Sequence, residues 1–120
     1  MAIVKGPDFI ALQVPDVEKS AKFYSEVLGL ERAPKSPPGA VVFLTSPIPF
    51  AVRKPHQALG SSPLGHGAAI WFLCDDSIEV YSKLKAHDVV LLDEPSPGPF
   101  GMTFHFKDID GYVITVHDKP

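Results

Sequence analysis

The chain has 120 residues, of which 45% are apolar and 21% are charged. This composition is that of an ordinary globular protein and excludes a disordered or fibrous chain. Lys and Arg number 11 against 14 Asp and Glu, a formal net charge of -3 without any basic cluster, so we expect no nucleic-acid partner. A single cysteine, no export signal and no run of about 18 apolar residues favour a cytoplasmic protein without membrane contact.

The first half of the chain predicts a strand, a helix and then further strands. Residues 9–14 alternate in polarity, as a half-buried strand does, and Asp16 follows as the expected N-cap of a helix. Gly29 is the expected end of that helix, because glycine readily takes the left-handed conformation of a C-terminal cap. Further strands are expected at residues 30–33, 40–45 and 48–53.

The second half repeats this order. A strand at residues 68–74 leads to a capping site at Asp75 and Asp76 and then to a helical stripe. Strands are expected at residues 89–92, 102–106 and 112–117, and the prolines at 95–99 are expected to mark a loop or a sheet edge. The order strand-helix-strand-strand-strand thus occurs twice and predicts one domain over residues 1–120. Its two modules are expected at about residues 8–54 and 68–118, with a linker at residues 55–67.

Two motifs resemble those of the vicinal oxygen chelate superfamily, the group of glyoxalases, bleomycin-resistance proteins and extradiol dioxygenases. Residues 23–30 (FYSEVLGL) are similar to its FY-x-x-x-LGL helix end. Residues 106–114 (FKDIDGYVI) are similar to its F-x-DPDG-x-x-I hairpin, with Ile109 where proline is usual. The resemblance implies an α+β fold in which two βαβββ modules form curled, half-open mixed sheets around a cavity. It also implies a homodimer.

Alternation along the strands assigns their residues to two faces. One face is apolar throughout, as a helix-facing core should be, and comprises Ile10, Leu12, Val14, Ile70, Phe72, Cys74, Phe104, Phe106, Ile114 and Val116. The other face mixes aromatic and polar side chains, whose polar groups need a ligand or water as partners when buried. From this face and its surroundings we expect ligand-binding roles for Phe9, Gln13, Phe43, Trp71, His105, Thr115 and His117.

Other chemically distinctive residues are expected to be structural. Cys74 falls on the apolar face and is expected to be a buried, inert thiol. Asp108 and Asp110 are expected to bond the backbone of their own turn rather than to act as a carboxylate pair. The remaining histidines are expected to be exposed: His56, His66 and His87.

The positions that bind metal in the resembled superfamily hold poor donors in this chain. Metal-using members place one ligand near the start of the first strand and one on the last strand of each module. The matching positions are Phe9, Ala69, Thr115 and one of residues 50–52, and none carries a strong donor. We therefore expect no metal cofactor. The alternative is a divalent ion at a rearranged site that joins His105 and His117.

Two classes of function stay open at this point. The first is metal-independent binding of a small organic, partly aromatic molecule, like the antibiotic sequestration of bleomycin-binding proteins. The second is a glyoxalase-like or dioxygenase-like enzyme, a lyase or isomerase, that uses His105 with Gln13 or Thr115 for proton transfer. The sequence does not decide whether the protein is an enzyme.

Overall fold

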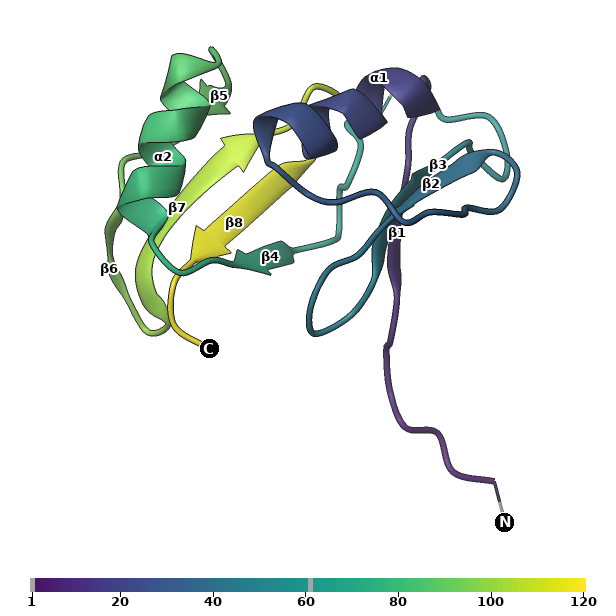
Figure 1. The fold of residues 1–120 in the computed structure, drawn as a ribbon, viewed down its shortest axis with the longest axis horizontal. Helices are drawn as coiled ribbons and strands as arrows, with labels where there is room; N and C mark the ends of the chain where they lie inside the picture. The colour runs from purple at the N-terminus through teal and green to yellow at the C-terminus, as the bar shows by residue number, and fades with distance from the viewer. Residues whose placement is uncertain (1, 61) are drawn as a thin grey trace. The chain divides into compact units, whose positions relative to one another are not determined.

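The computed structural model describes residues 2–60 and 62–120 (Figure 1). The chain divides into two compact units, Met1–Leu59 and Gly60–Pro120, each with a mixed sheet and a helix. Neither sheet closes into a barrel, which confirms the expected α+β fold with two half-open mixed sheets. No helix among the described residues combines the length and the apolar composition needed to cross a bilayer.

The first unit is a three-stranded sheet with its helix packed on one face. Strand β1 (Ile10–Gln13) pairs in parallel with β3 (Phe50–Arg53), which pairs antiparallel with β2 (Ala40–Phe43), so the strand order is β1-β3-β2. Helix α1 (Val17–Lys22) continues into a π-helical segment, η1 (Phe23–Val27). Helix α1 contacts β2 and β3 (Figure 1).

The ends of this helix follow the sequence prediction. Asp16 is the N-cap, and its Oδ1 accepts a hydrogen bond from the Lys19 N–H at 3.1 Å. Gly29 leaves the helix with a φ of 81°, a region that glycine enters without a Cβ clash. The strand expected at residues 30–33 does not form, because pairing there is limited to one bridge between Arg32 and Phe43.

The second unit is a five-stranded sheet with α2 (Ser77–Ala86) on one face. Its strands are β4 (Ile70–Leu73), β5 (Val90–Leu91), β6 (Ser96–Gly98), β7 (Gly101–Lys107) and β8 (Val113–His117). The order is β4-β8-β7-β5 with β6 also paired to β7; β4 and β8 run parallel and the other pairs antiparallel. Asp76 caps α2 as expected, and the proline-containing strand β6 lies in the stretch that was expected to be a loop or a sheet edge.

Burial confirms the assignment of faces from alternation. Most of the apolar set predicted to face the helices is buried: Leu12, Val14, Ile70, Phe104, Phe106, Ile114 and Val116. Its other three members, Ile10, Phe72 and Cys74, are half-buried. In the second unit, the Phe104 ring meets Tyr81 of α2 edge-on, with 5.3 Å between ring centroids. This contact shows that the apolar face packs on the helix, and the alternate residues of the same strands therefore point away from it.

The hairpin between β7 and β8 depends on Asp108, as its position in the motif predicts. Asp108 is buried, and its Oδ1 accepts hydrogen bonds from the backbone N–H groups of Asp110 and Tyr112, both at 2.9 Å. The Asp108 N–H donates in turn to the Tyr112 carbonyl at 3.0 Å. The turn thereby sets the register that places His105 opposite Thr115 on the two strands.

Two buried helical serines differ in how their hydroxyls are satisfied. Ser20 and Ser77 are both fully buried, but Ser77 Oγ donates to the Met102 carbonyl at 2.7 Å, whereas Ser20 Oγ has no hydrogen-bond partner among the described residues. Ser20→Ala is expected to raise the free energy of unfolding by about 1 kcal/mol, because it removes an unsatisfied buried group and favours the helix. The matched control Ser77→Ala is expected to lower it by about 1 kcal/mol. Urea titrations measure both, and equal losses in the two variants would contradict this reading.

Candidate functional site

The sheet of the second unit has an outer face, which points away from α2. Its members alternate with the buried residues of β4, β7 and β8: Trp71, Leu73, Thr103, His105, Val113, Thr115 and His117. The register places Trp71 beside Thr115, and Thr115 opposite His105, in one row across the three strands. A second row holds Leu73 beside His117, and His117 opposite Thr103. Four residues predicted to bind ligand therefore share this face: Trp71, His105, Thr115 and His117.

Three rings gather at one end of the outer face. Trp71, Phe100 and His117 form this aromatic cluster, with ring centroids 5.5 Å apart for Trp71 and His117, 6.0 Å for Trp71 and Phe100, and 6.1 Å for Phe100 and His117. All three pairs meet edge-on. Trp71 and Phe100 are each 47% exposed, so the cluster presents flat apolar surface to a ligand.

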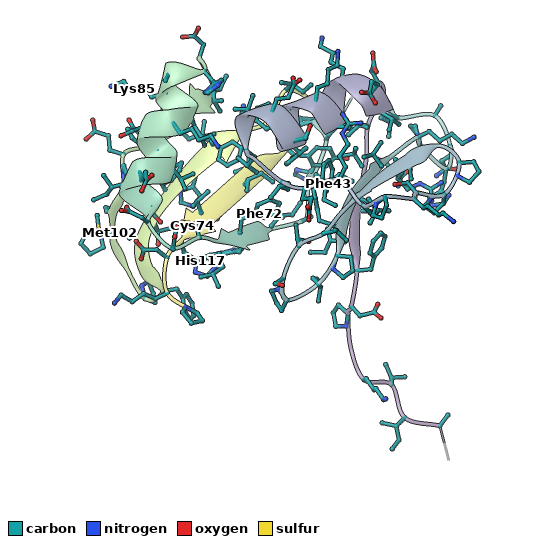
Figure 2. The ribbon with its side chains drawn as sticks, viewed as in Figure 1. Phe43, Phe72, Cys74, Lys85, Met102 and His117 are labelled. Atoms are coloured by element: carbon teal, nitrogen blue, oxygen red, sulfur yellow. The ribbon has the colours of Figure 1, made fainter. Side chains whose placement is uncertain are left out.

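A hydrogen bond fixes the tautomer of the His117 ring within this cluster. Its Nδ1 lies 2.9 Å from the carbonyl oxygen of Lys119. Since a carbonyl only accepts, Nδ1 carries the proton and, in the neutral ring, Nε2 is left as an acceptor. Figure 2 shows His117 at the end of β8, near the C-terminus. The cluster thus combines stacking surface with a hydrogen-bonding nitrogen.

His105 is held by a carboxylate on the neighbouring loop. Asp93 follows β5, and its two oxygens accept from the same residue: Oδ1 from the His105 backbone N–H at 2.7 Å, and Oδ2 from the His105 ring at Nδ1, at 2.8 Å. The Leu92 N–H donates to the His105 carbonyl at 2.9 Å and keeps this loop against β7. The His105 side chain is still 38% exposed. This arrangement orients the imidazole while leaving it accessible.

Thr115 occupies the middle of the row between Trp71 and His105. It is buried, being only 6% exposed. Neighbouring strands lie about 4.8 Å apart, so the backbones of Trp71 and His105 are about 10 Å apart across the sheet. A ligand that contacts both Trp71 and His105 therefore has to extend along this row, over Thr115.

The remaining predicted site residues belong to the first unit. Gln13 ends β1, and its Oε1 accepts a hydrogen bond from the His56 N–H at 2.8 Å. Phe9 lies just before β1, so strand alternation does not place its side chain on either face of the sheet. The side chain is half-exposed.

The structure places Phe43 in the core and not on the expected ligand wall. It is completely buried, and its ring centroid lies 5.9 Å from that of Phe50, on which it stacks, and 6.2 Å from that of Tyr24 of η1. The physical reason is register: Phe43 pairs with Phe50, and Phe50 with Ile10, so all three share the face that packs on the helix. In this conformation the Phe43 ring has no surface to offer a ligand.

Two residues of the outer-face site were missed by sequence reasoning. Phe100 lies in the turn between β6 and β7, and Asp93 lies in the loop after β5. The signal for Phe100 was an aromatic residue immediately before a strand; Asp93 gave none, because its contact with His105 depends on the pairing of β5 with β7.

Cys74 and the acidic side chains do not form a reactive or metal-binding group here. Burial raises the pKa of the Cys74 thiol, whose Sγ lies 3.5 Å from Ser77 Oγ, so it stays protonated at neutral pH. Within residues 2–60 and 62–120, no three His, Cys, Asp or Glu side chains come together as a metal site. The contacts confirm the expected turn role of Asp108, whereas Cys74 is half-buried and not fully buried as expected.

Comparisons with known proteins give the family. A sequence model of the Glyoxalase/Bleomycin resistance protein/Dioxygenase superfamily matches residues 6–116. The uncharacterised protein YetH of Bacillus subtilis (strain 168) is 27% identical over an alignment of 122 positions. The alignment covers 97% of this chain and 100% of that protein.

Solved structures show the same fold. TnmS3, an antibiotic binding protein from Streptomyces sp. CB03234, is 20% identical over 100% of both chains, with a TM-score of 0.78. A superfamily member from Sphaerobacter thermophilus is 22% identical over 97% of this chain and 98% of its own, also with a TM-score of 0.78. With the family match extending over nearly the whole sequence, as the two motifs predicted, the chain belongs to the Glyoxalase/Bleomycin resistance protein/Dioxygenase superfamily.

Proposed function

We propose that this protein binds a small planar organic molecule on the aromatic cluster of its second unit and needs no metal ion to do so. The observation that carries the proposal is the cluster itself: Trp71 and Phe100 are each 47% exposed although they contact one another and His117. Large aromatic side chains left accessible beside a few polar groups are typical of sites for organic ligands. The description of TnmS3 as an antibiotic binding protein supports an antibiotic-like ligand.

Metal independence is supported by the chemistry of the side chains. Phe9, Ala69 and Thr115 stand where metal-using relatives carry ligands, and a neutral hydroxyl or a hydrocarbon is a poor donor for a divalent ion. The two outer-face histidines, His105 and His117, are bonded only through Nδ1 and each keep Nε2 as an acceptor. A stable site needs three or four ligands, and within residues 2–60 and 62–120 no three His, Cys, Asp or Glu side chains come together. Stacking and hydrogen bonds are then the interactions that the face offers.

Equilibrium dialysis against 2-naphthol tests this function. We expect saturable binding at one site per chain, with the same affinity before and after treatment with EDTA. The matched control is Ile78→Ala, which removes an exposed apolar side chain from α2, on the other side of the sheet; its affinity is expected to equal that of the wild type. Failure to bind a panel of planar aromatic molecules, or binding that EDTA abolishes and a divalent ion restores, would contradict the proposal.

A proton-transfer enzyme is the second candidate, and the contact between Asp93 and His105 favours it. A carboxylate on Nδ1 orients an imidazole so that Nε2 can take a proton from a substrate. Turnover of methylglyoxal hemithioacetal or of catechols that His105→Ala abolishes would support this candidate.

A homodimer in the cytoplasm remains our proposal for assembly and location; light scattering that shows only monomer at micromolar concentration would contradict the dimer.

A further inference from the structure

We propose that the Asp93–His105 pair makes the outer-face site selective for planar ligands that carry a hydroxyl group, such as a phenol or an enol. This inference rests on the proposed function, since it names the class of ligand that the aromatic cluster binds. Asp93 is a positioning residue in it, because the group that meets the ligand is the His105 ring.

The first step is the protonation of the imidazole. An ionised carboxylate only accepts hydrogen bonds. The 2.8 Å contact between Asp93 Oδ2 and His105 Nδ1 therefore requires the ring proton on Nδ1. In the neutral ring Nε2 is then an acceptor, and among the described residues none hydrogen-bonds it.

The second step is the rigidity of this tautomer. Asp93 Oδ1 also accepts from the backbone N–H of His105 at 2.7 Å, so the carboxylate cannot rotate away without breaking two bonds to one residue. Two strands pair with this edge of β7: β5 with Phe106 and Lys107, and β6 with Gly101, Met102 and Thr103. The Asp93 carboxylate bonds the β7 backbone at His105, in the gap between them. The acceptor on His105 is fixed before a ligand arrives, which lowers the entropy cost of recognition.

The third step is the distance to the aromatic cluster. Trp71, Thr115 and His105 lie side by side on the neighbouring strands β4, β8 and β7. Two inter-strand spacings, about 10 Å, therefore separate the backbones of Trp71 and His105. A ligand of two fused rings that stacks at Trp71 therefore extends toward His105. The polar group on that end must donate a hydrogen bond to be satisfied by Nε2.

Matched probes test the selectivity. 2-Naphthol and 2-methoxynaphthalene share the ring system and differ in the hydroxyl proton, and 2-acetylnaphthalene only accepts. By equilibrium dialysis, the wild type is expected to bind 2-naphthol about fivefold more tightly than the methyl ether, the effect of one neutral hydrogen bond. His105→Leu is expected to bind both equally, while its backbone N–H still bonds Asp93.

Asp93→Asn separates positioning from simple structural support. The amide oxygen can still accept from the His105 backbone N–H, but the amide NH₂ donates to Nδ1 and moves the ring proton to Nε2. We expect this variant to lose the preference for 2-naphthol and to bind 2-acetylnaphthalene more tightly than the wild type does. The ¹⁵N chemical shifts of the His105 ring are expected to change from the Nδ1–H to the Nε2–H tautomer.

The outcomes are distinguishable from failure of the proposed function. If the wild type binds all three probes with equal affinity, and neither variant changes this, the selectivity inference is overturned while ligand binding stands. If the wild type binds none of them, the proposed function itself fails. A wild-type ring nitrogen spectrum with the proton on Nε2 would also overturn the inference, whatever the affinities.

Discussion

Asp108→Ala is expected to lower the free energy of unfolding by about 3 kcal/mol, because the buried carboxylate accepts two backbone hydrogen bonds of its own turn. The N–H groups of Asp110 and Tyr112 each donate to Oδ1 at 2.9 Å, and the second of these bonds is buried. Leaving a buried donor unsatisfied costs about 1–3 kcal/mol. Since a domain of this size has a total stability of about 5–15 kcal/mol, the loss is a large part of it. Urea denaturation followed by circular dichroism measures it.

Asp108→Asn is the matched control for this effect. The amide keeps an oxygen in place of Oδ1, so both N–H groups retain an acceptor, although a neutral one. We expect a loss of about 1 kcal/mol, the difference between charged and neutral hydrogen bonds. If the asparagine and alanine variants were destabilised equally, the two backbone bonds would not be the source of the effect.

Trp71→Ala is expected to weaken binding of 2-naphthol about 30-fold, because it removes the largest ring from the aromatic cluster. An aromatic side chain that stacks on a planar ligand contributes about 2 kcal/mol, and each 1.4 kcal/mol is a factor of about 10 in affinity. Trp71 is 47% exposed and its replacement leaves the helix-facing core intact, so folding is expected to persist. Isothermal titration calorimetry measures the affinity. Tryptophan fluorescence cannot be used, because this variant lacks the only tryptophan of the sequence.

Two further substitutions serve as controls for the effect of Trp71→Ala. Trp71→Phe keeps a flat ring at the same place and is expected to bind with an affinity between those of the wild type and the alanine variant. Val113→Ala removes an exposed apolar side chain from the same face, two residues along β8 from Thr115, and is expected to change the affinity little. Equal losses of affinity in Trp71→Ala and Val113→Ala would indicate non-specific hydrophobic binding to the whole face and contradict a site centred on the aromatic cluster.

Local signals predicted most of the fold. Asp16 and Asp76 cap their helices as the sequence indicates, because the capping interaction needs only a carboxylate and N–H groups three residues ahead. Alternation identified the buried side of β7 and β8 correctly, since their register is fixed by a short hairpin. No strand was predicted at β6 as such: Pro97 indicates a loop or a sheet edge, and β6 is an outer strand, where proline is tolerated.

The error at Phe43 and the omission of Asp93 have a common physical origin. Which face Phe43 occupies depends on its pairing with Phe50, and which residue Asp93 contacts depends on the pairing of β5 with β7. Register between strands joined by long loops is set by packing of the whole unit, and a slip of one residue exchanges the faces. The outer-face positions of Trp71, His105 and His117 were predicted correctly because their strands are joined through the Asp108 turn or pair directly with one that is.

The measurement that tests the central claim most directly is an NMR titration of the ¹⁵N-labelled, EDTA-treated protein with 2-naphthol. We expect saturable shifts of the Trp71 indole N–H and of the amides of Phe100, Thr115 and His117, with little change in α2. Shifts confined to residues outside the outer face, or shifts that appear only after a divalent metal ion is added, would contradict a metal-independent site on the aromatic cluster.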